Sequence, residues 1–397
     1  MSFAKVRHTL FTVHMWIGLI LGVLLAALGL SGSLLVYDEA IADLLSPPPR
    51  AATIGQPLPL TMLANTAREA AAAQGIDGGQ MQVIVPQRAR DAVVVRFGGI
   101  SPMGNMPAAG GERRSQGQGG QRRPEVRRAG GLQVYLDPVS GEVLGSRKSV
   151  LPPFLTFAHQ LHGNFLMSRE TGRPIVGWLG VAMCLLGLSG LVLWWPKRGQ
   201  WQYAFKMRRQ ATGLRFYREL HAATGIWIFV VFMAVSFSGV VIAWPQTTGL
   251  NPPGFNPRAL PTVEPADGKR LDPTEAVIAA ATAVPGLKPR GIIIPARPDQ
   301  PISVNYLSHD AINATVFVDP YSGKVLLVRD NSERFLAWMR PVHDGSNLST
   351  VWRFLVFLSG LVPLLFVVTG IIMWWKKRKR HIPMTSMTDD LAEETPA

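Results

Sequence analysis

The chain has 397 residues, of which 47% are hydrophobic and only 17% charged, and its mean hydropathy is +0.17. A soluble domain carries more charge, and here the apolar residues gather in long runs instead of recurring with a helical or strand period. The composition therefore excludes an ordinary soluble domain and indicates a membrane protein. The net charge of +14 would suit a nucleic-acid partner, but much of it flanks the apolar runs, so nucleic-acid binding is not expected.

Four runs are long enough to cross a bilayer as helices, for which roughly 20 apolar residues are needed. They extend over Leu10 to Val36, Ile175 to Trp195, Ile226 to Trp244 and Phe354 to Trp375. The first run is too long for the core of a cleaved signal peptide, so we expect it to remain as an anchor. The single cysteine, Cys184, lies within the second run, which excludes intrachain disulfides and a haem attached through a C-x-x-C-H motif.

Basic residues are distributed unevenly around these runs. The connection between the second and third runs is rich in Lys and Arg and has Glu219 as its single acidic residue, and the segment from Lys376 to Arg380 is wholly basic. Cytoplasmic loops of membrane proteins are enriched in Lys and Arg, so both segments and both termini are expected in the cytoplasm. The long connections, at about Asp38 to Pro174 and Pro245 to Arg353, are then expected on the opposite side of the membrane.

The two halves of the sequence resemble each other. Each long connection contains a similar turn, YLDPVSGEVL from Tyr135 and FVDPYSGKVL from Phe317, and a double tryptophan follows each turn at a similar distance. A helical pattern and alternating strand-like runs precede each turn. The expected fold is a four-helix transmembrane bundle built from two repeats, with two α+β domains in the long connections, at residues 38–150 and 246–340.

The remaining segments follow from this plan. Transmembrane helices are expected within residues 1–37, 175–195, 221–245 and 341–375, an interfacial segment at 151–174, a basic cytoplasmic loop at 196–220 and a cytoplasmic tail at 376–397. A Gly- and Arg-rich insert at about residues 99–131 is expected to be disordered.

Four of the eight histidines are duplicated with the repeat. His14 and His221 lie near the start of matched runs, and His162 and His343 lie at matched distances before the double tryptophans. Neutral imidazole binds iron without adding charge to an apolar bundle, and an ionisable residue in or beside a span is typical of a functional site. If a pseudo-twofold axis relates the halves, each matched pair can hold one metal ion. The sequence predicts two such sites, one near each membrane face.

Glycines accompany the first histidine pair. Gly18 and Gly225 each follow a histidine by four positions and so share its helical face, where a flat haem would contact the backbone. The alternative is ordinary helix packing, since Gly18 and Gly22 also form a small-residue motif. His159 has no matched histidine. We expect it to face water or to hydrogen-bond a haem propionate or the substrate.

Two segments, QLHGNFLMSRETGRPIVGWLGVAMCLLGLSGLVLWWPKR and PVHDGSNLSTVWRFLVFLSGLVPLLFVVTGIIMWWKKR, resemble the PepSY-associated transmembrane family. The two expected α+β domains look like PepSY domains, and the resemblance implies that these PepSY-like α+β domains are periplasmic, outside a bacterial inner membrane. Members of the family include inner-membrane ferric-siderophore reductases of the FoxB kind, which carry two b-type haems. The resemblance implies that His14 with His221, and His162 with His343, are the axial ligands of two haem b groups. It also implies that electrons pass from a cytoplasmic or membrane donor to a periplasmic ferric siderophore, which then releases ferrous iron.

The main alternative is a PepSY-type binding or protease-regulating membrane module without redox activity, because isolated PepSY domains resemble protease propeptides. This alternative accounts for the outer segments but not for four matched histidines. A transporter with a proton relay would need carboxylates inside the apolar runs, and the sequence has none there. No catalytic triad, phosphate-binding loop or zinc motif is recognisable, which argues against hydrolase chemistry.

Overall fold

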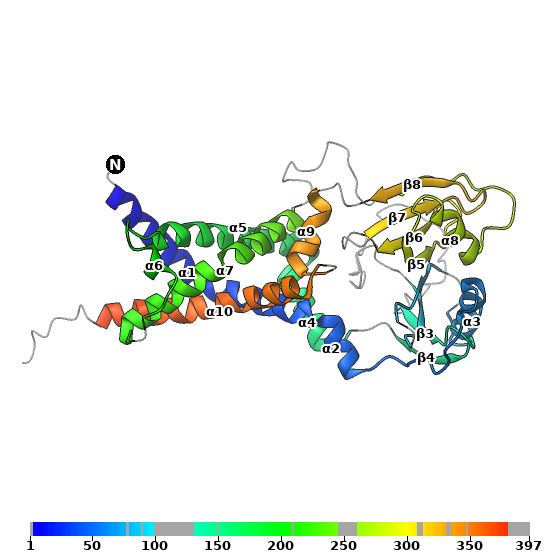
Figure 1. Cartoon of the computed structure of the whole chain (residues 1–397), viewed down its shortest axis with the longest axis horizontal. Coiled ribbons are helices and arrows are strands. Elements are labelled where there is room, and N and C mark those ends of the chain that lie inside the picture. The colour runs from blue at the N-terminus through cyan, green and yellow to red at the C-terminus, as the bar shows by residue number, and fades with distance from the viewer. Residues whose placement is uncertain are drawn as a thin grey trace, which may run out of the picture. The chain divides into compact units, whose positions relative to one another are not determined.

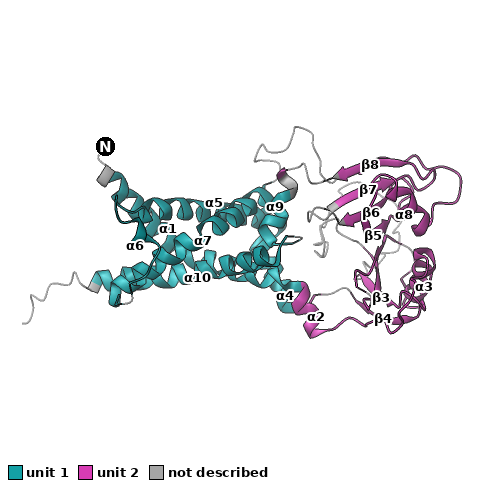
Figure 2. Ribbon diagram, viewed as in Figure 1, with its two compact units in different colours: residues 1–38, 153–251, 336–397 teal, residues 39–152, 252–335 magenta. Residues whose placement is uncertain are grey.

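The computed structural model describes residues 3–76, 79–88, 90–98, 131–148, 151–208, 210–244, 260–307, 313–330, 335–346 and 348–379. The predicted insert at about 99–131 lies, except for Gly131, outside the described residues. The chain divides into two compact units, which Figure 2 distinguishes by colour. Unit 1 contains residues 1–38, 153–251 and 336–397, and unit 2 contains residues 39–152 and 252–335.

Unit 1 is a bundle of helices (Figure 1). Among the described residues, four helices are long and apolar enough to cross a membrane: α1 (Phe3–Val36), α5 (Arg169–Trp194), α7 (Gly213–Ala243) and α10 (Thr350–Lys379). These helices contain the four predicted runs almost completely and extend beyond most of their ends, because the polar flanks continue the helical hydrogen bonding. The chain is therefore a membrane protein.

Shorter helices complete unit 1. α4 (Pro153–Asn164) precedes α5, α9 (Phe335–Asp344) precedes α10, and α6 (Trp201–Ala204) lies between α5 and α7. The beginning of α1, the short α6 and the end of α10 lie at the same end of the bundle (Figure 1). The basic segments that flank α5, α7 and α10 are therefore gathered at one end of unit 1.

Small residues let the long helices approach each other closely. α1 packs along α10, and α5 packs along α7. A methyl group at Gly29 would lie 2.4 Å from the carbonyl oxygen of Gly360, and one at Gly360 would lie 2.3 Å from Ser33 Oγ. Neither position can accept a larger residue without moving the helices apart, so these glycines fix the α1–α10 contact.

Two arginines at corresponding positions in the two halves of the chain donate hydrogen bonds to carbonyls at the C-terminal ends of neighbouring helices. Arg173 on α5 donates to the carbonyl of Ile242 near the end of α7 at 2.7 Å, and Arg353 on α10 donates to the carbonyl of Val36 at the end of α1 at 2.9 Å. The last carbonyls of a helix lack intrahelical partners, and a cation there also complements the helix dipole. These contacts join the helix ends at the side of the bundle away from α6.

Unit 2 is an antiparallel sheet with helices packed on it. Its eight described strands follow the order β4-β3-β2-β1-β5-β6-β7-β8. The first four are β1 (Met81–Ile84), β2 (Val93–Phe97), β3 (Leu132–Leu136) and β4 (Val143–Lys148). The other four are β5 (Lys288–Ile294), β6 (Ile302–Leu307), β7 (Asn313–Val318) and β8 (Val325–Asp330). The helices are α3 (Leu60–Ala72) and α8 (Pro273–Ala281), while α2 (Asp38–Leu45) follows directly after α1.

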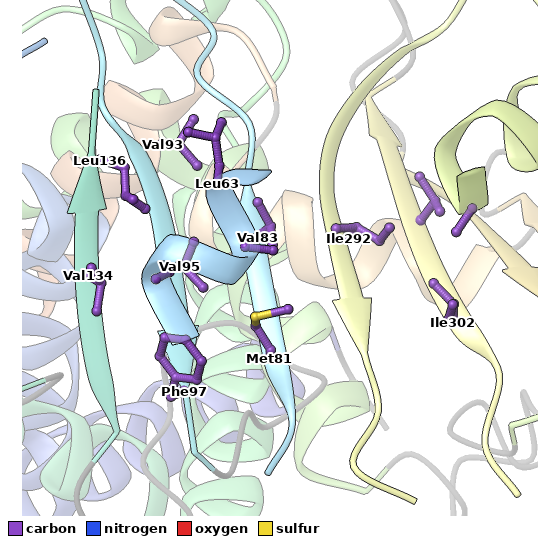
Figure 3. Packing of buried hydrophobic residues seen from close by; sticks show 14 of the residues in the cluster. Leu63, Met81, Val83, Val93, Val95, Phe97, Val134, Leu136, Ile292 and Ile302 are labelled. Carbon is purple, nitrogen blue, oxygen red and sulfur yellow. The ribbon is translucent and has the colours of Figure 1, made fainter. Parts of the chain in front are cut away.

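The centre of the sheet joins the two segments that we expected as separate α+β domains. β1 pairs with β5, with Val83 opposite Ile292. One apolar cluster runs across this seam and includes side chains from α3 and α8 as well as from the strands (Figure 3). The two segments therefore share one sheet and one core.

The two DP-x-SG turns, from which the sequence predicts a repeat, are held by their aspartates. Asp137, which is 1% exposed, accepts backbone hydrogen bonds from Val139 at 2.9 Å and Ser140 at 3.1 Å, and also from Ala52 and Thr53. Burial opposes ionisation, but these backbone donors prevail and lower the pKa of Asp137 to about 2. The carboxylate therefore remains charged at neutral pH and fixes the hairpin between β3 and β4.

Candidate histidine-pair sites

The first site joins two short helices. The rings of His162 on α4 and His343 on α9 have their centres 5.9 Å apart. His162 Nδ1 lies 2.9 Å from the carbonyl oxygen of Leu28 on α1, and His343 Nδ1 lies 2.9 Å from that of Val235 on α7. A carbonyl can only accept a hydrogen bond, so Nδ1 carries the proton in both rings. The lone pair of each neutral ring is therefore on Nε2.

Glycines on the long helices make room for these rings. A methyl group at Gly32 of α1 would lie 2.7 Å from Cε1 of His162, and one at Gly239 of α7 would lie 2.9 Å from Cε1 of His343. Each glycine follows a serine whose hydroxyl donates to its own helix, as Ser238 does to the carbonyl of Ala234 at 2.7 Å. The Ser-Gly dipeptides thus form two matching recesses that hold the imidazoles.

Both rings of this pair are neutral at neutral pH. They lie outside the four candidate membrane spans. Burial lowers the pKa of His162 to about 4, and the nearby His343 contributes to the shift. Burial also lowers the pKa of His343. Neutral imidazole is the form that can donate a lone pair to a metal.

The second site joins two long helices. The rings of His14 on α1 and His221 on α7 have their centres 6.3 Å apart. His14 Nδ1 lies 2.8 Å from Ser189 Oγ on α5, and His221 Nδ1 lies 2.7 Å from Thr369 Oγ1 on α10. Here the ring partners are side-chain hydroxyls rather than backbone carbonyls.

The hydroxyls select the same tautomer as the carbonyls do. Ser189 Oγ donates to the carbonyl of Leu185 at 2.6 Å, and Thr369 Oγ1 donates to the carbonyl of Leu365 at 2.8 Å. A hydroxyl has one proton to donate, so each oxygen accepts a hydrogen bond from the histidine Nδ1. All four rings therefore present an Nε2 lone pair.

The spacing of both pairs fits an iron ion between the rings. Two metal–nitrogen bonds of about 2 Å on opposite sides of the iron, together with the distance from each nitrogen to its ring centre, place the ring centres roughly 6 Å apart. A metal-binding histidine also characteristically donates its other ring N–H to a carbonyl or another acceptor. The separations of 5.9 and 6.3 Å and the Nδ1 partners agree with both requirements.

Each site brings two imidazole donors together. The described residues contain no group of three or more His, Cys, Asp or Glu side chains arranged to hold a metal. Structural and catalytic zinc sites need three or four protein ligands, whereas haem iron takes four equatorial ligands from its macrocycle and two axial ligands from the protein. Two opposed imidazoles are therefore a complete protein ligand set for haem and an incomplete one for zinc.

The two pairs lie at opposite ends of the bundle. On α1, His14 and the glycine that contacts His162 are eighteen residues apart, which corresponds to about 27 Å of helix. The same interval separates His221 and Gly239 on α7. Between the ends, a cluster that includes Leu28, Leu179 and Phe232 fills the bundle with apolar side chains.

The glycines that the sequence singled out have different surroundings. A methyl group at Gly18 would meet nothing within 4 Å, whereas one at Gly22 would lie 2.5 Å from Val367 Cγ2. Close helix packing therefore depends on Gly22, and Gly18 faces open space. A methyl group at Gly225 would lie 3.7 Å from Phe366 Cζ, whose ring lies against His221.

His159 lies near the first pair but is not a member of it. Its Nε2 is 2.9 Å from Asp38 Oδ2, and the two side chains are 21% and 16% exposed. The sequence predicts that His159 faces water or hydrogen-bonds a haem propionate or the substrate, and in the structure it bonds the carboxylate of Asp38 in unit 1. In the second half, Arg340 occupies the matched position and pairs with Asp344 at 3.0 Å.

Sequence reasoning missed the groups that orient the histidines, although the sequence contains a signal for them. Each of the four spans carries at least one Ser-Gly or Thr-Gly dipeptide, and one such dipeptide in each span lies beside one of the four histidines. The dipeptides beside the histidines are Ser31-Gly32, Ser189-Gly190, Ser238-Gly239 and Thr369-Gly370. Thr171-Gly172 and Ser359-Gly360 are further dipeptides of this kind, and a methyl group at either glycine would meet Asn164 or Ser33 rather than a histidine. Recurrence alone therefore does not identify the faces that receive the rings.

Four spans together with an antiparallel α+β unit define a multi-pass membrane protein with PepSY-like parts. The chain matches the family described as the PepSY-associated TM region over residues 11–377, which is nearly its whole length, and it belongs to that family. Comparison with curated proteins found no match.

Proposed function

We propose that this protein is a di-haem reductase of the bacterial inner membrane. It carries electrons from the cytoplasmic side to a periplasmic ferric siderophore and thereby releases ferrous iron. The observation that supports the proposal most strongly is the pairing of the histidines at 5.9 and 6.3 Å, with every Nδ1 engaged by a partner that leaves Nε2 free for iron.

The residues of each site have separate tasks in this proposal. Haem bound at each pair supplies a one-electron carrier. His14 with His221, and His162 with His343, would hold this haem through Nε2, while the Nδ1 hydrogen bonds fix the ring orientations and raise the basicity of Nε2. The apolar cluster between the two ends excludes water and ions from the bundle.

The charge distribution supports the direction of transfer. The basic segments lie at the end of the bundle that contains His14 and His221, and such segments favour the cytoplasmic side. Electrons from a cytoplasmic or membrane donor would enter at that end and leave at the His162–His343 end. Ferrous iron is softer and less charged than ferric iron, so reduction weakens its binding to the hard oxygen ligands of a siderophore.

To test the proposal, the purified full chain is reduced anaerobically and then mixed with a ferric hydroxamate chelate and a colorimetric reagent that binds ferrous iron. Wild-type protein should be reoxidised while ferrous iron forms. His343→Ala should keep the other haem but reduce the chelate far more slowly, because the electron exit is lost. Purified protein without haem, or equal rates for both proteins, would contradict the proposal.

A further inference from the structure

Unit 2 contains a cavity that the histidine chemistry does not use. Its volume is about 250 Å³, and its lining comes from both halves of the sheet, with Met81 on β1, Phe97 on β2 and Ile294 on β5. Met81 and Phe97 stand side by side on neighbouring strands (Figure 3). Drug-sized ligands occupy pockets of roughly 300–1,000 Å³, so this cavity suits a smaller molecule. Its floor is apolar.

Two arginines supply the charge of the cavity. Arg68, on α3, and Arg270, which precedes α8, both line it, and no acidic side chain is among the described lining residues. The Arg270 guanidinium is anchored by one nitrogen, because Nη1 donates to the carbonyl of Pro295 at 3.3 Å. Its Nη2 is buried and has no hydrogen-bond partner.

An unpartnered buried N–H group of a charged side chain is costly, and native proteins normally satisfy such groups with protein, water or ligand. A guanidinium presents its donors in a planar fork that matches a carboxylate in shape and charge. The apolar floor adds a second requirement, because it contacts a flat hydrocarbon body better than a hydrated inorganic anion. The cavity thus combines a cationic wall with an apolar base.

We propose that this cavity is a binding site for a small carboxylate with a flat apolar body, such as an aromatic acid. Arg270 binds the carboxylate, Arg68 adds positive charge at the more exposed wall, and Met81 and Phe97 contact the body. All of these groups belong to unit 2, so the site stands independently of haem binding by unit 1.

The test uses the full chain in lipid nanodiscs at neutral pH, with radiolabelled benzoate as the probe in equilibrium dialysis and empty nanodiscs as the blank. Benzamide, which has the same shape without the charge, and inorganic phosphate, which has the charge without the ring, are the ligand-side controls. Arg270→Met and Arg68→Met test the cationic wall. Arg88→Met removes an exposed arginine of unit 2 that does not line the cavity.

Benzoate should bind wild type and Arg88→Met saturably with one site per chain, and Arg270→Met should weaken it about tenfold or more. Arg68→Met should weaken it less, and both controls should bind more weakly than benzoate. Circular dichroism and thermal unfolding report whether each variant is folded. If Arg270→Met fails to fold, the proposal is still tested by comparing benzoate binding to Arg68→Met and wild type, and by comparing benzamide with benzoate on wild type. Absence of saturable binding, or benzamide or phosphate binding as tightly as benzoate, would overturn the proposal.

Discussion

The two halves of the chain each supply one ring to both histidine pairs, and they hold these rings in corresponding ways. In each half, the histidine of a long helix bonds a hydroxyl, from Ser189 in the first half and Thr369 in the second. The histidine of a short helix bonds a backbone carbonyl, from Leu28 in the first half and Val235 in the second. The correspondence extends to the proton position, since all four rings carry the proton on Nδ1.

The surroundings of the rings do not correspond in the same way. His159 bonds Asp38 in the first half, whereas Arg340 stands at the matched position in the second half and bonds Asp344. The comparison separates the groups that define the site, which both halves share, from neighbouring groups, which differ. It also shows that the two pairs depend on different atoms, since a hydroxyl can be removed by substitution and a backbone carbonyl cannot.

The largest expected effect comes from the matched histidines. His162→Ala and His343→Ala should each remove one of two haems and leave the other spectrum unchanged, because the two pairs lie at opposite ends of the bundle. His159→Ala should keep nearly all the haem, because its partner is Asp38 rather than the other ring. The quantity to measure is the number of haems per chain in each of the three variants. If His159→Ala lost half the haem and His162→Ala kept all of it, the ligand would be His159 rather than His162, and the correspondence between the two halves would be wrong.

The next effect concerns the recesses for the rings. Gly32→Ala and Gly239→Ala place a methyl group 2.7 and 2.9 Å from Cε1 of His162 and His343, so the ring or the helix must move. Each variant should strongly reduce haem occupancy at the His162–His343 pair and spare the other pair. Gly18→Ala is the matched control, because its methyl group meets nothing within 4 Å. Equal occupancy in all three variants, determined by haem titration, would mean that the recesses do not set the ring positions.

A smaller effect separates hydroxyl partners from carbonyl partners. Ser189→Ala and Thr369→Ala should weaken haem affinity at the His14–His221 pair by about 10–100-fold, the usual effect of removing a hydrogen-bond partner of a metal-binding histidine. Ser238→Ala should have little effect, because the ring of His343 is held by a carbonyl at 2.9 Å while the Ser238 hydroxyl is 3.4 Å away. The measurement is a haem titration of each variant. Comparable losses in all three would show that the hydroxyls act on the helices rather than on the rings.

The smallest effect lies in the paired turns of unit 2. Asp137 is buried with four backbone donors, whereas Asp319 is half-buried and accepts from Tyr321 and Ser322. Asp137→Asn should therefore cost roughly 1–3 kcal/mol and Asp319→Asn less. Thermal unfolding of the full chain measures both.

The pH dependence of this effect follows from the depressed pKa. The folded-state pKa of Asp137, about 2, is below its ordinary value of 3.8, so its ionised form stabilises the fold above pH 3.8 and this stabilisation is lost as pH falls toward 2. The stability difference between wild type and Asp137→Asn should be full at neutral pH and shrink below about pH 4. A difference that stays constant to pH 2 would show that the charge of Asp137 is not what holds the turn.

The membrane part of the fold could be predicted from local sequence. Length and apolarity alone located the four long helices, because a bilayer imposes a minimum span on any helix that crosses it. The single sheet of unit 2 could not be predicted in this way. The seam that pairs Val83 with Ile292 joins segments about two hundred residues apart, and no local pattern encodes which edge strands will meet.

The histidine pairs were accessible to sequence reasoning because duplication marks which residues correspond. Their hydrogen-bond partners were not, since a serine or threonine in a helix ordinarily bonds its own preceding turn. Ser189 and Thr369 do this and also accept from the histidines, which only the packing of neighbouring helices reveals. The hydrogen-bond partner of His159 could not be predicted from the sequence, because that partner, Asp38, lies outside any repeated motif.

If each histidine pair holds one haem, as proposed, the haem content of the chain follows directly. The most direct measurement is a pyridine haemochrome assay on the purified full chain, with the protein concentration determined by amino-acid analysis. We expect two b-type haems per chain, and a low-spin reduced-minus-oxidised spectrum typical of two axial imidazoles. A value below one haem per chain in folded protein supplied with excess haem would contradict it.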